Sequence, residues 1–197
     1  ELVIRCDPQL LDLALTHRSY AFENGGIPTN ERLEFLGDAI LEVGVTDYLY
    51  RAFPDKPEGQ LAKLRSAVVS TVSLGQLARQ LGIGPRIKLG RGEERTGGHD
   101  KTSILADTTE ALLGAVEVSS GLPDALRLVH HLFDPLVDEA NRSGAGTDWK
   151  TVLQEYCAEH GFDAPRDEIV GSGPAHHRRY CARANVDGKL HAAYTGP

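Results

Sequence analysis

The 197-residue sequence predicts an all-α domain followed by a small α+β domain. Three observations support this division. Apolar residues recur at three- and four-residue spacing throughout residues 1–140, and residues 141–147 have the Gly- and Ser-containing composition of a linker. Residues 148–197 then change from helical spacing to short strand-like segments. We therefore expect one domain over residues 1–140 and a second over residues 148–197.

Six helices are expected in the first part. Segments with Gly or Pro separate them, such as "ENGGIPTN" and "FPDKPEGQ". The β-branched residues at 68–72 are weakly strand-like, but they lie between helical patterns and are assigned to helices. The apolar stretches span residues 10–15, 33–49, 61–69, 72–81, 104–118 and 122–136.

The second part predicts one helix and three strands. Residues 148–161, "DWKTVLQEYCAEHG", form a helix that Asp148 can cap and Gly161 can end. Strands are expected over 167–173, 176–188 and 189–196, with "DGK" as a hairpin turn. Because so small a sheet needs a further element to cover it, we expect an α-β-β-β-α unit whose last helix lies beyond Pro197.

Composition excludes several classes of protein. There is no apolar run of about 18 residues and no signal-peptide pattern, so we expect no membrane association. The three cysteines are widely spaced and odd in number, which favours a reducing, cytoplasmic location. The net charge of −7 lies entirely in residues 1–140, where it suits cation binding better than direct binding of phosphate. The absence of Met suggests that the sequence starts inside a longer reading frame.

Two of the predicted helices carry carboxylates on one side and apolar residues on the other. On a helix over residues 30–45, four carboxylates fall within about 80° of one another: Glu31, Glu34, Asp38 and Glu42. On a helix over residues 103–117, Asp107 and Glu110 share one face. Like charges one turn apart destabilise a helix, and desolvation adds to that cost. A solvated acidic face is the alternative for either helix alone, but two such helices favour a shared cation site.

Oxygen ligands favour Mg²⁺, or Mn²⁺ in its place, over zinc. Both acidic helices also contain a glycine, Gly37 and Gly114, and each glycine costs about 1 kcal/mol relative to alanine in a helix. We expect these glycines where a backbone or a ligand approaches closely.

Several segments resemble one protein family. "NERLEFLGDAIL" (residues 30–41) resembles the signature motif of the bacterial ribonuclease III endonucleases. "EGQLAKLRSAVV" (58–69) and "LGRGEERTGGHDKTSILADTTEALLGA" (89–115) follow in that family's order. "DWKTVLQEYCAEHG" and "GSGPAHHRRYCARANVDGK" resemble a double-stranded-RNA-binding domain. The resemblance covers nearly the whole chain. It implies an all-α nuclease domain and a small α+β RNA-binding domain whose last helix is missing from this sequence.

The resemblance also implies a function. It predicts an Mg²⁺-dependent endoribonuclease that cleaves double-stranded RNA to 5′-phosphate and 3′-hydroxyl ends, and that processes rRNA precursors and other structured RNAs. The family's catalytic pair matches Asp38 and Glu110. Its metal site matches Glu34, Asp38, Asp107 and Glu110, and accessory acidic positions match Glu31, Glu58 and Glu93.

Two kinds of partner follow from the resemblance. The nuclease domains are expected to form a homodimer that cuts opposite strands of one duplex. Phe35 and Leu36 are candidates for that contact, and packing within one chain is the alternative for each. In the second domain, the residues expected to contact RNA are Gln154, Glu155, Gly173, Pro174 and His176.

The sequence departs from the family pattern in two places. A Ser-Lys-Lys segment that opens the family's last helix is absent, and the first strand lacks the usual proline-aromatic pattern. Arg178 and Arg179 are either near the RNA or part of a solvated strand face.

Competing interpretations explain less of the sequence. "HD" at His99 and Asp100 is typical of metal-dependent phosphohydrolases, but the other histidines lack the helical pattern which that chemistry requires. A non-catalytic RNA-binding protein or chaperone would be free to lose carboxylates such as Asp38 and Glu110, and both are present. A structural helical scaffold leaves the two acidic faces unexplained.

Overall fold

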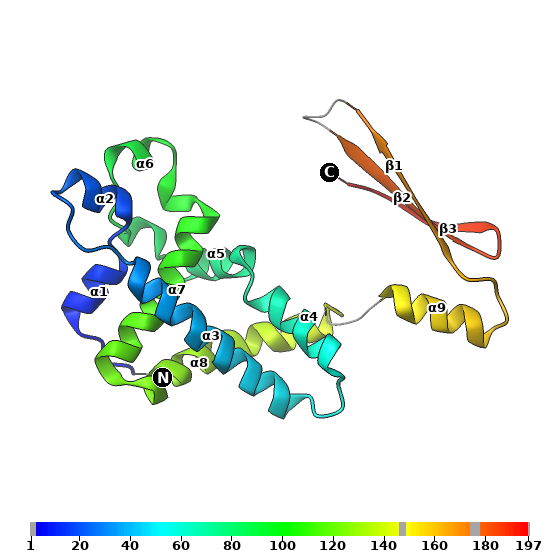
Figure 1. Ribbon diagram of the computed structural model, residues 1–197, viewed down its shortest axis with the longest axis horizontal. Helices are drawn as coiled ribbons and strands as arrows, with labels where there is room; N and C mark the ends of the chain where they lie inside the picture. Colours follow the sequence, from blue (N-terminus) through cyan, green and yellow to red (C-terminus); the bar gives the residue numbers. More distant parts are fainter. Residues whose placement is uncertain (1–2, 146–148, 174–177, 197) are drawn as a thin grey trace. The chain divides into compact units, whose positions relative to one another are not determined.

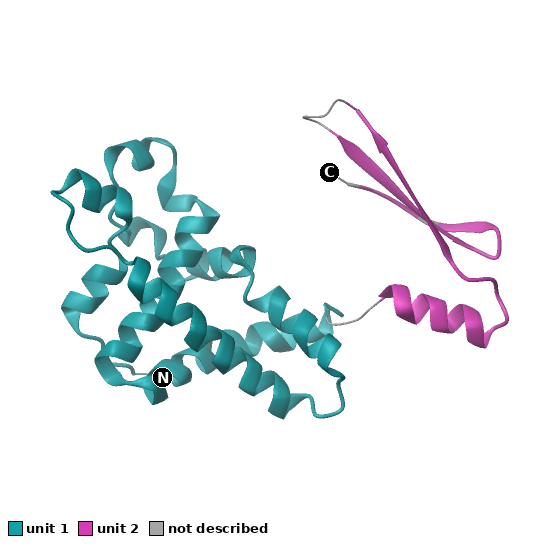
Figure 2. Ribbon diagram, in the orientation of Figure 1, with its two compact units in different colours: residues 1–146 teal, residues 147–197 magenta. Residues whose placement is uncertain are grey.

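The computed structural model describes residues 3–145, 149–173 and 178–196. The chain divides into two compact units, residues 1–146 and 147–197 (Figure 2). The first unit is helical, and the second combines one helix with a three-stranded sheet (Figure 1). The last helix of the first unit continues to Arg142, so the first two residues of the predicted linker are helical.

Six helices of the first unit correspond to the six predicted ones. They are α1 (Pro8–Ala14), α3 (Glu31–Ala52), α4 (Glu58–Val68), α5 (Thr71–Gln80), α7 (Thr102–Ser120) and α8 (Leu122–Arg142). Shorter turns of helix lie between the predicted helices. These are α2 (Arg18–Glu23), α6 (Arg91–Arg95) and the 3₁₀ turns η1 (Gly84–Arg86) and η2 (Gly98–Asp100). The β-branched stretch contains the break between α4 and α5, where Ser70 caps α5 by accepting from the Ser73 N–H.

The core of the first unit forms where α3, α7 and α8 pack together. Leu41, Leu113 and Phe133, one from each helix, are among its fully buried side chains. Asn30 precedes α3 and anchors its start, because its buried side-chain amide donates to the carbonyl of Ala14 at 3.2 Å. The first turn of α3 is therefore held against α1, and the carboxylates that follow it have a defined position.

The second unit begins with α9 (Trp149–Glu159) and continues as strands β1 (Arg166–Ser172), β2 (Arg179–Val186) and β3 (Lys189–Gly196). The strands pair antiparallel in the order β1-β2-β3. The predicted hairpin turn is confirmed: Asp187 and Gly188 both have positive φ, 51° and 74°, as a two-residue type I′ turn requires. The predicted α-β-β-β order is also confirmed, although β2 is shorter than the strand expected over residues 176–188.

In the described parts of the chain, no helix is both long enough and apolar enough to cross a bilayer.

Candidate functional site

The crossing of α3 and α7 brings the two acidic faces together, and two glycines make the crossing possible. A Cβ atom on Gly37 would lie 2.6 Å from the carbonyl carbon of Glu110 and 3.0 Å from the backbone nitrogen of Gly114. A Cβ atom on Gly114 would lie 2.9 Å from the carbonyl carbon of Leu33. The helices thus touch backbone to backbone, which confirms the close approach predicted at both glycines. Residues flanking Gly37 on α3 therefore face residues flanking Glu110 on α7.

Three of the four predicted metal ligands converge at this crossing. One carboxylate oxygen from each of Glu34, Asp107 and Glu110 lies within 4.8 Å of the others, and all three residues are half-buried. Asp38 is exposed and stands outside this group of three, one helical turn along α3 from Glu34. We call these three residues the carboxylate cluster.

The carboxylate cluster is electrostatically unfavourable as it stands. The pKa of Glu110 is raised to about 7, first by burial and then by four neighbouring carboxylates, Asp38, Asp107, Glu34 and Glu42. Burial also raises the pKa of Glu34, and the charge of Asp107 adds to it. Burial likewise raises the pKa of Asp107. Like charges in a partly desolvated site favour the protonated form of each carboxyl.

The residues present fit a divalent cation with oxygen ligands. Hard cations such as Mg²⁺ bind carboxylates, and Mg²⁺ keeps several waters, so three or four carboxylates beside an open cavity suit it. A bound cation would also reverse the sign of the local potential and favour the ionised form of each carboxyl. The donor set contains no thiolate or imidazole, which argues against zinc.

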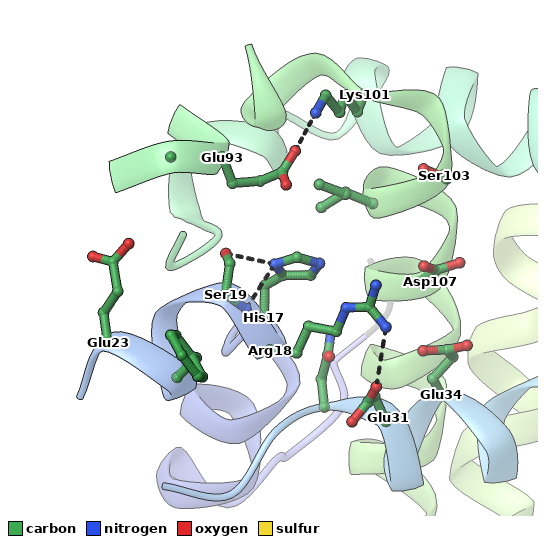
Figure 3. Close-up of a pocket in the computed structure, with 14 residues that line it drawn as sticks. His17, Arg18, Ser19, Glu23, Glu31, Glu34, Glu93, Lys101, Ser103 and Asp107 are labelled. Carbon is green, nitrogen blue, oxygen red and sulfur yellow. Dashed lines mark hydrogen bonds and ion pairs between the residues drawn. The ribbon is translucent and has the colours of Figure 1, made fainter. Parts of the chain in front are cut away.

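A cavity of about 900 Å³ opens beside the carboxylate cluster, and Figure 3 shows the side chains that line it. Glu34 and Asp107 form part of one wall. The N-cap and first turn of α2 supply His17, Arg18 and Ser19. Sequence reasoning missed these three, because the six residues of α2 are too few for apolar periodicity to show. The only signal in the sequence was that three polar residues stand together before an apolar one, and such a triplet is weak evidence for a functional site.

The accessory acidic residues lie in different surroundings. Glu31 lines the cavity, accepts from the Thr29 hydroxyl at 2.8 Å, and lies 4.0 Å from the Arg18 guanidinium. Glu93, on α6, also lines the cavity, and its ion pair with Lys101 lowers its pKa. Glu58, at the start of α4, lines a different cavity between α3 and α4. The structure therefore brings Glu31 and Glu93 to the cavity beside the carboxylate cluster, but not Glu58.

The fourth carboxylate of the predicted α3 stripe has a separate partner. Glu42 forms an ion pair with Arg65 of α4, with 3.0 Å between Oε2 and Nε. Both side chains are partly exposed, so Glu42 belongs to a solvated helix face. This is the alternative to a cation site that the sequence allows for an acidic face.

The two proposed dimer residues differ in exposure. Phe35 is 81 % exposed on α3, whereas Leu36 packs against the core of its own unit. Packing within the chain thus accounts for Leu36, and Phe35 is the exposed one of the two candidates.

The predicted RNA-contacting residues lie in the second unit. Gln154 and Glu155 are exposed on α9, and Gly173, with φ +94°, directly follows β1. Pro174 and His176 lie outside the described residues. Arg179 begins β2 and is exposed.

Comparison with known proteins identifies the families that this two-domain architecture matches. Residues 7–136 match the family model described as "Ribonuclease-III-like", and residues 149–197 match "Double-stranded RNA binding motif". Together these matches cover both units. The chain belongs to the ribonuclease III family.

Several ribonuclease III proteins are similar to this chain in sequence or in structure. The chain is 57% identical over 189 residues to the Ribonuclease 3 of Thermobifida fusca, which covers 96% of this chain and 79% of that protein. A crystal structure of the nuclease domain of ribonuclease III from Campylobacter jejuni has a TM-score of 0.61 at 40% identity, covering 66% of this chain and 85% of that one. A second structure of that domain, with a TM-score of 0.59 and 41% identity over 65% of this chain and 90% of that one, is described as showing structural flexibility in a region involved in dimer formation. As a member of the family with both domains, the chain is a double-stranded-RNA-specific endoribonuclease.

Proposed function

We propose that Glu34, Asp38, Asp107 and Glu110 bind Mg²⁺, for which Mn²⁺ can substitute, and that this site hydrolyses double-stranded RNA to 5′-phosphate and 3′-hydroxyl ends. The observation that carries this proposal is the convergence of three half-buried carboxylates, one of which has its pKa raised to about 7. Such a group of charges is stable in ionised form only with a compensating cation. When bound, the ion supplies Lewis acidity and positive charge at the phosphodiester.

The four carboxylates are proposed to have different roles. Glu34, Asp107 and Glu110 are direct ligands, since their oxygens already lie within reach of one ion. Glu110, whose pKa is about 7, is partly protonated near neutral pH in the metal-free protein and would lose that proton on binding a cation. Asp38 forms the catalytic pair with Glu110. Because Asp38 is exposed one turn from Glu34, a change of rotamer lets its carboxylate approach the cluster or the incoming RNA.

RNA is proposed to be held by both units. A-form RNA is recognised largely by shape and by its 2′-hydroxyls and phosphates. Gln154 and Glu155 on α9, together with residues 173–176, are proposed to contact the duplex. Glu31, Glu58 and Glu93 are proposed to act as accessory positions. The processed RNAs include rRNA precursors, in keeping with the family.

We further propose that the nuclease domain forms a homodimer in which Phe35 contacts the partner. An aromatic side chain that is 81 % exposed on a helix of the nuclease domain supports this assignment. Two sites in one dimer would cut opposite strands of one duplex. All three cysteines are unpaired thiols, which supports a reducing, cytoplasmic location.

The test is cleavage of a long, end-labelled RNA duplex by the purified chain, in Mg²⁺ and in EDTA, beside Glu110→Gln. We expect Mg²⁺-dependent cleavage by the wild type and a loss of at least about 100-fold in the variant. Glu139→Gln is the matched control, because Glu139 forms an exposed surface pair with Arg142. Cleavage that persists in EDTA would overturn the metal site, and RNA binding without cleavage in any divalent metal would favour the non-catalytic alternative.

A further inference from the structure

The charged residues that line the cavity beside the carboxylate cluster are mostly carboxylates, but they include an arginine that the metal site does not explain. Arg18 projects from the start of α2 toward Glu31, Glu34 and Asp107 (Figure 3). Arg18 lines the same cavity as Glu34 and Asp107, so its positive charge lies beside the carboxylate cluster. A cation next to this site repels an incoming metal ion, so its presence calls for a second explanation.

Arg18 is weakly engaged in this structure. Its ion pair from Nη1 to Glu31 Oε1 is 4.0 Å long, at the limit for such a contact, and its side chain is 74% exposed. Glu31 has a shorter contact elsewhere, to the Thr29 hydroxyl at 2.8 Å. A guanidinium carries five N–H donors in a planar fork that matches the geometry of a phosphate. Exchanging one long contact for a bidentate contact to an anion is therefore favourable for Arg18.

His17 adds a second donor to the same cavity, and its hydrogen bonds determine which nitrogen carries the proton. The Gly90 N–H donates to Ser19 Oγ at 2.9 Å, and the Ser19 N–H donates to His17 Nδ1 at 3.2 Å. Ser19 Oγ also lies 2.8 Å from Nδ1. Because Nδ1 accepts, the neutral imidazole carries its proton on Nε2. That N–H is on the edge of the ring turned away from Ser19, within the cavity wall (Figure 3).

We propose that Arg18, assisted by the Nε2–H of His17, binds a phosphate of the RNA strand next to the phosphodiester held at the carboxylate cluster. The cavity is continuous with Glu34 and Asp107, so a strand that enters it has consecutive phosphates at the cation site and at Arg18. Glu31 is the resting partner of Arg18 and gives way to the phosphate. Lys101 does not fill this role, because Glu93 already pairs with it.

The experiment separates this role from that of the metal site, on whose proposed function it rests. Binding of a synthetic RNA duplex is measured in Mg²⁺ with the full chain carrying Glu110→Gln, so that cleavage does not intervene. Arg18→Gln is then added, and Arg127→Gln serves as the charge-matched control, because Arg127 pairs with Asp124 on α8 and does not line the cavity. We expect Arg18→Gln to weaken binding about tenfold and to reduce the slope of log K against log salt concentration by about 0.9. Arg18→Lys, which keeps the charge but not the fork, should lose less affinity and keep the slope.

Single methylphosphonate linkages then locate the contact. Each is placed in one strand with the preceding ribose 2′-O-methylated for stability, and a duplex with the 2′-O-methyl group alone is the reference. One linkage near the cut site should weaken binding by Glu110→Gln about tenfold and have no further effect when Arg18→Gln is present.

Three outcomes would overturn the assignment: an unchanged salt slope in Arg18→Gln, equal effects of Arg127→Gln, or additive effects of every methylphosphonate. If Arg18 only balanced the carboxylates, Arg18→Gln would change the Mg²⁺ concentration needed for cleavage and leave RNA binding in the Glu110→Gln background unchanged. Failure of the wild-type chain to cleave would refute the proposed function instead.

Discussion

Replacing Gly37 by alanine tests the idea that backbone contact between α3 and α7 builds the site. The new Cβ would lie 2.6 Å from the carbonyl carbon of Glu110 and 3.0 Å from the nitrogen of Gly114, where ordinary contacts are 3.4–4 Å. The helices must therefore separate by about 1 Å, since backbone atoms in the middle of a helix have no rotamer by which to move aside. Overpacking of this kind costs about 1–3 kcal/mol or more, and the better helix propensity of alanine returns about 1 kcal/mol.

The expected net loss for Gly37→Ala is about 2 kcal/mol, which lowers the melting temperature by roughly 4–8 °C in a domain of this size. Separation of the helices also moves Glu34 away from Asp107 and Glu110. A misplacement of about 1 Å at a reacting centre can reduce the rate about 100-fold. Thermal unfolding followed by circular dichroism measures the first effect, and cleavage of an RNA duplex at saturating Mg²⁺ measures the second.

Gly59→Ala is the matched control. Gly59 lies in α4, and a Cβ atom added to it would meet nothing within 4 Å. Alanine there should therefore raise stability by about 0.5–1 kcal/mol and leave cleavage unchanged. The reasoning is refuted if Gly37→Ala melts within about 1 °C of the wild type, well short of the shift expected for a domain of this size, and cleaves RNA at the wild-type rate.

Three further predictions concern charge and association. In EDTA the melting temperature of the first unit should fall as pH rises, because the pKa of Glu110 is about 7 when folded against 4.5 as its ordinary value. The contribution of Glu110 to the free energy of unfolding is fully present below pH 4.5 and is lost as pH rises through 7. After solvent screening this loss is at most about 2 kcal/mol. A melting temperature that stays constant over this pH range would contradict the prediction. Glu110→Gln should flatten that profile and remove most of the stabilisation that Mg²⁺ gives the wild type at about pH 8, measured by melting with and without the ion. Phe35→Asp should shift the protein from dimer to monomer in analytical ultracentrifugation. Val72→Asp, at a residue that is 61% exposed on α5, is the control and should leave the dimer intact. Equal behaviour of the two variants would exclude Phe35 from the interface.

Much of the fold and the acidic site can be predicted from sequence because both depend on local periodicity. A helix places Glu34 and Asp38 one turn apart wherever it packs, and the same spacing groups Asp107 with Glu110. Gly37 and Gly114 indicate the crossing, because a glycine inside a stable helix has a cost that close packing can offset. The hairpin turn at Asp187 and Gly188 is similarly local, since both residues tolerate positive φ.

Tertiary structure alone decided the features that depend on distances between elements. Apolar periodicity does not indicate α2, which is six residues long, and its position beside α6 brings His17 and Arg18 to the cavity. Packing also separated residues that look alike in sequence: Leu36 is partly buried against the core, while its neighbour Phe35 is exposed. The physical reason is that a helix determines the direction of its own side chains, whereas the approach of a second helix determines which of them are buried, paired or close enough to share an ion.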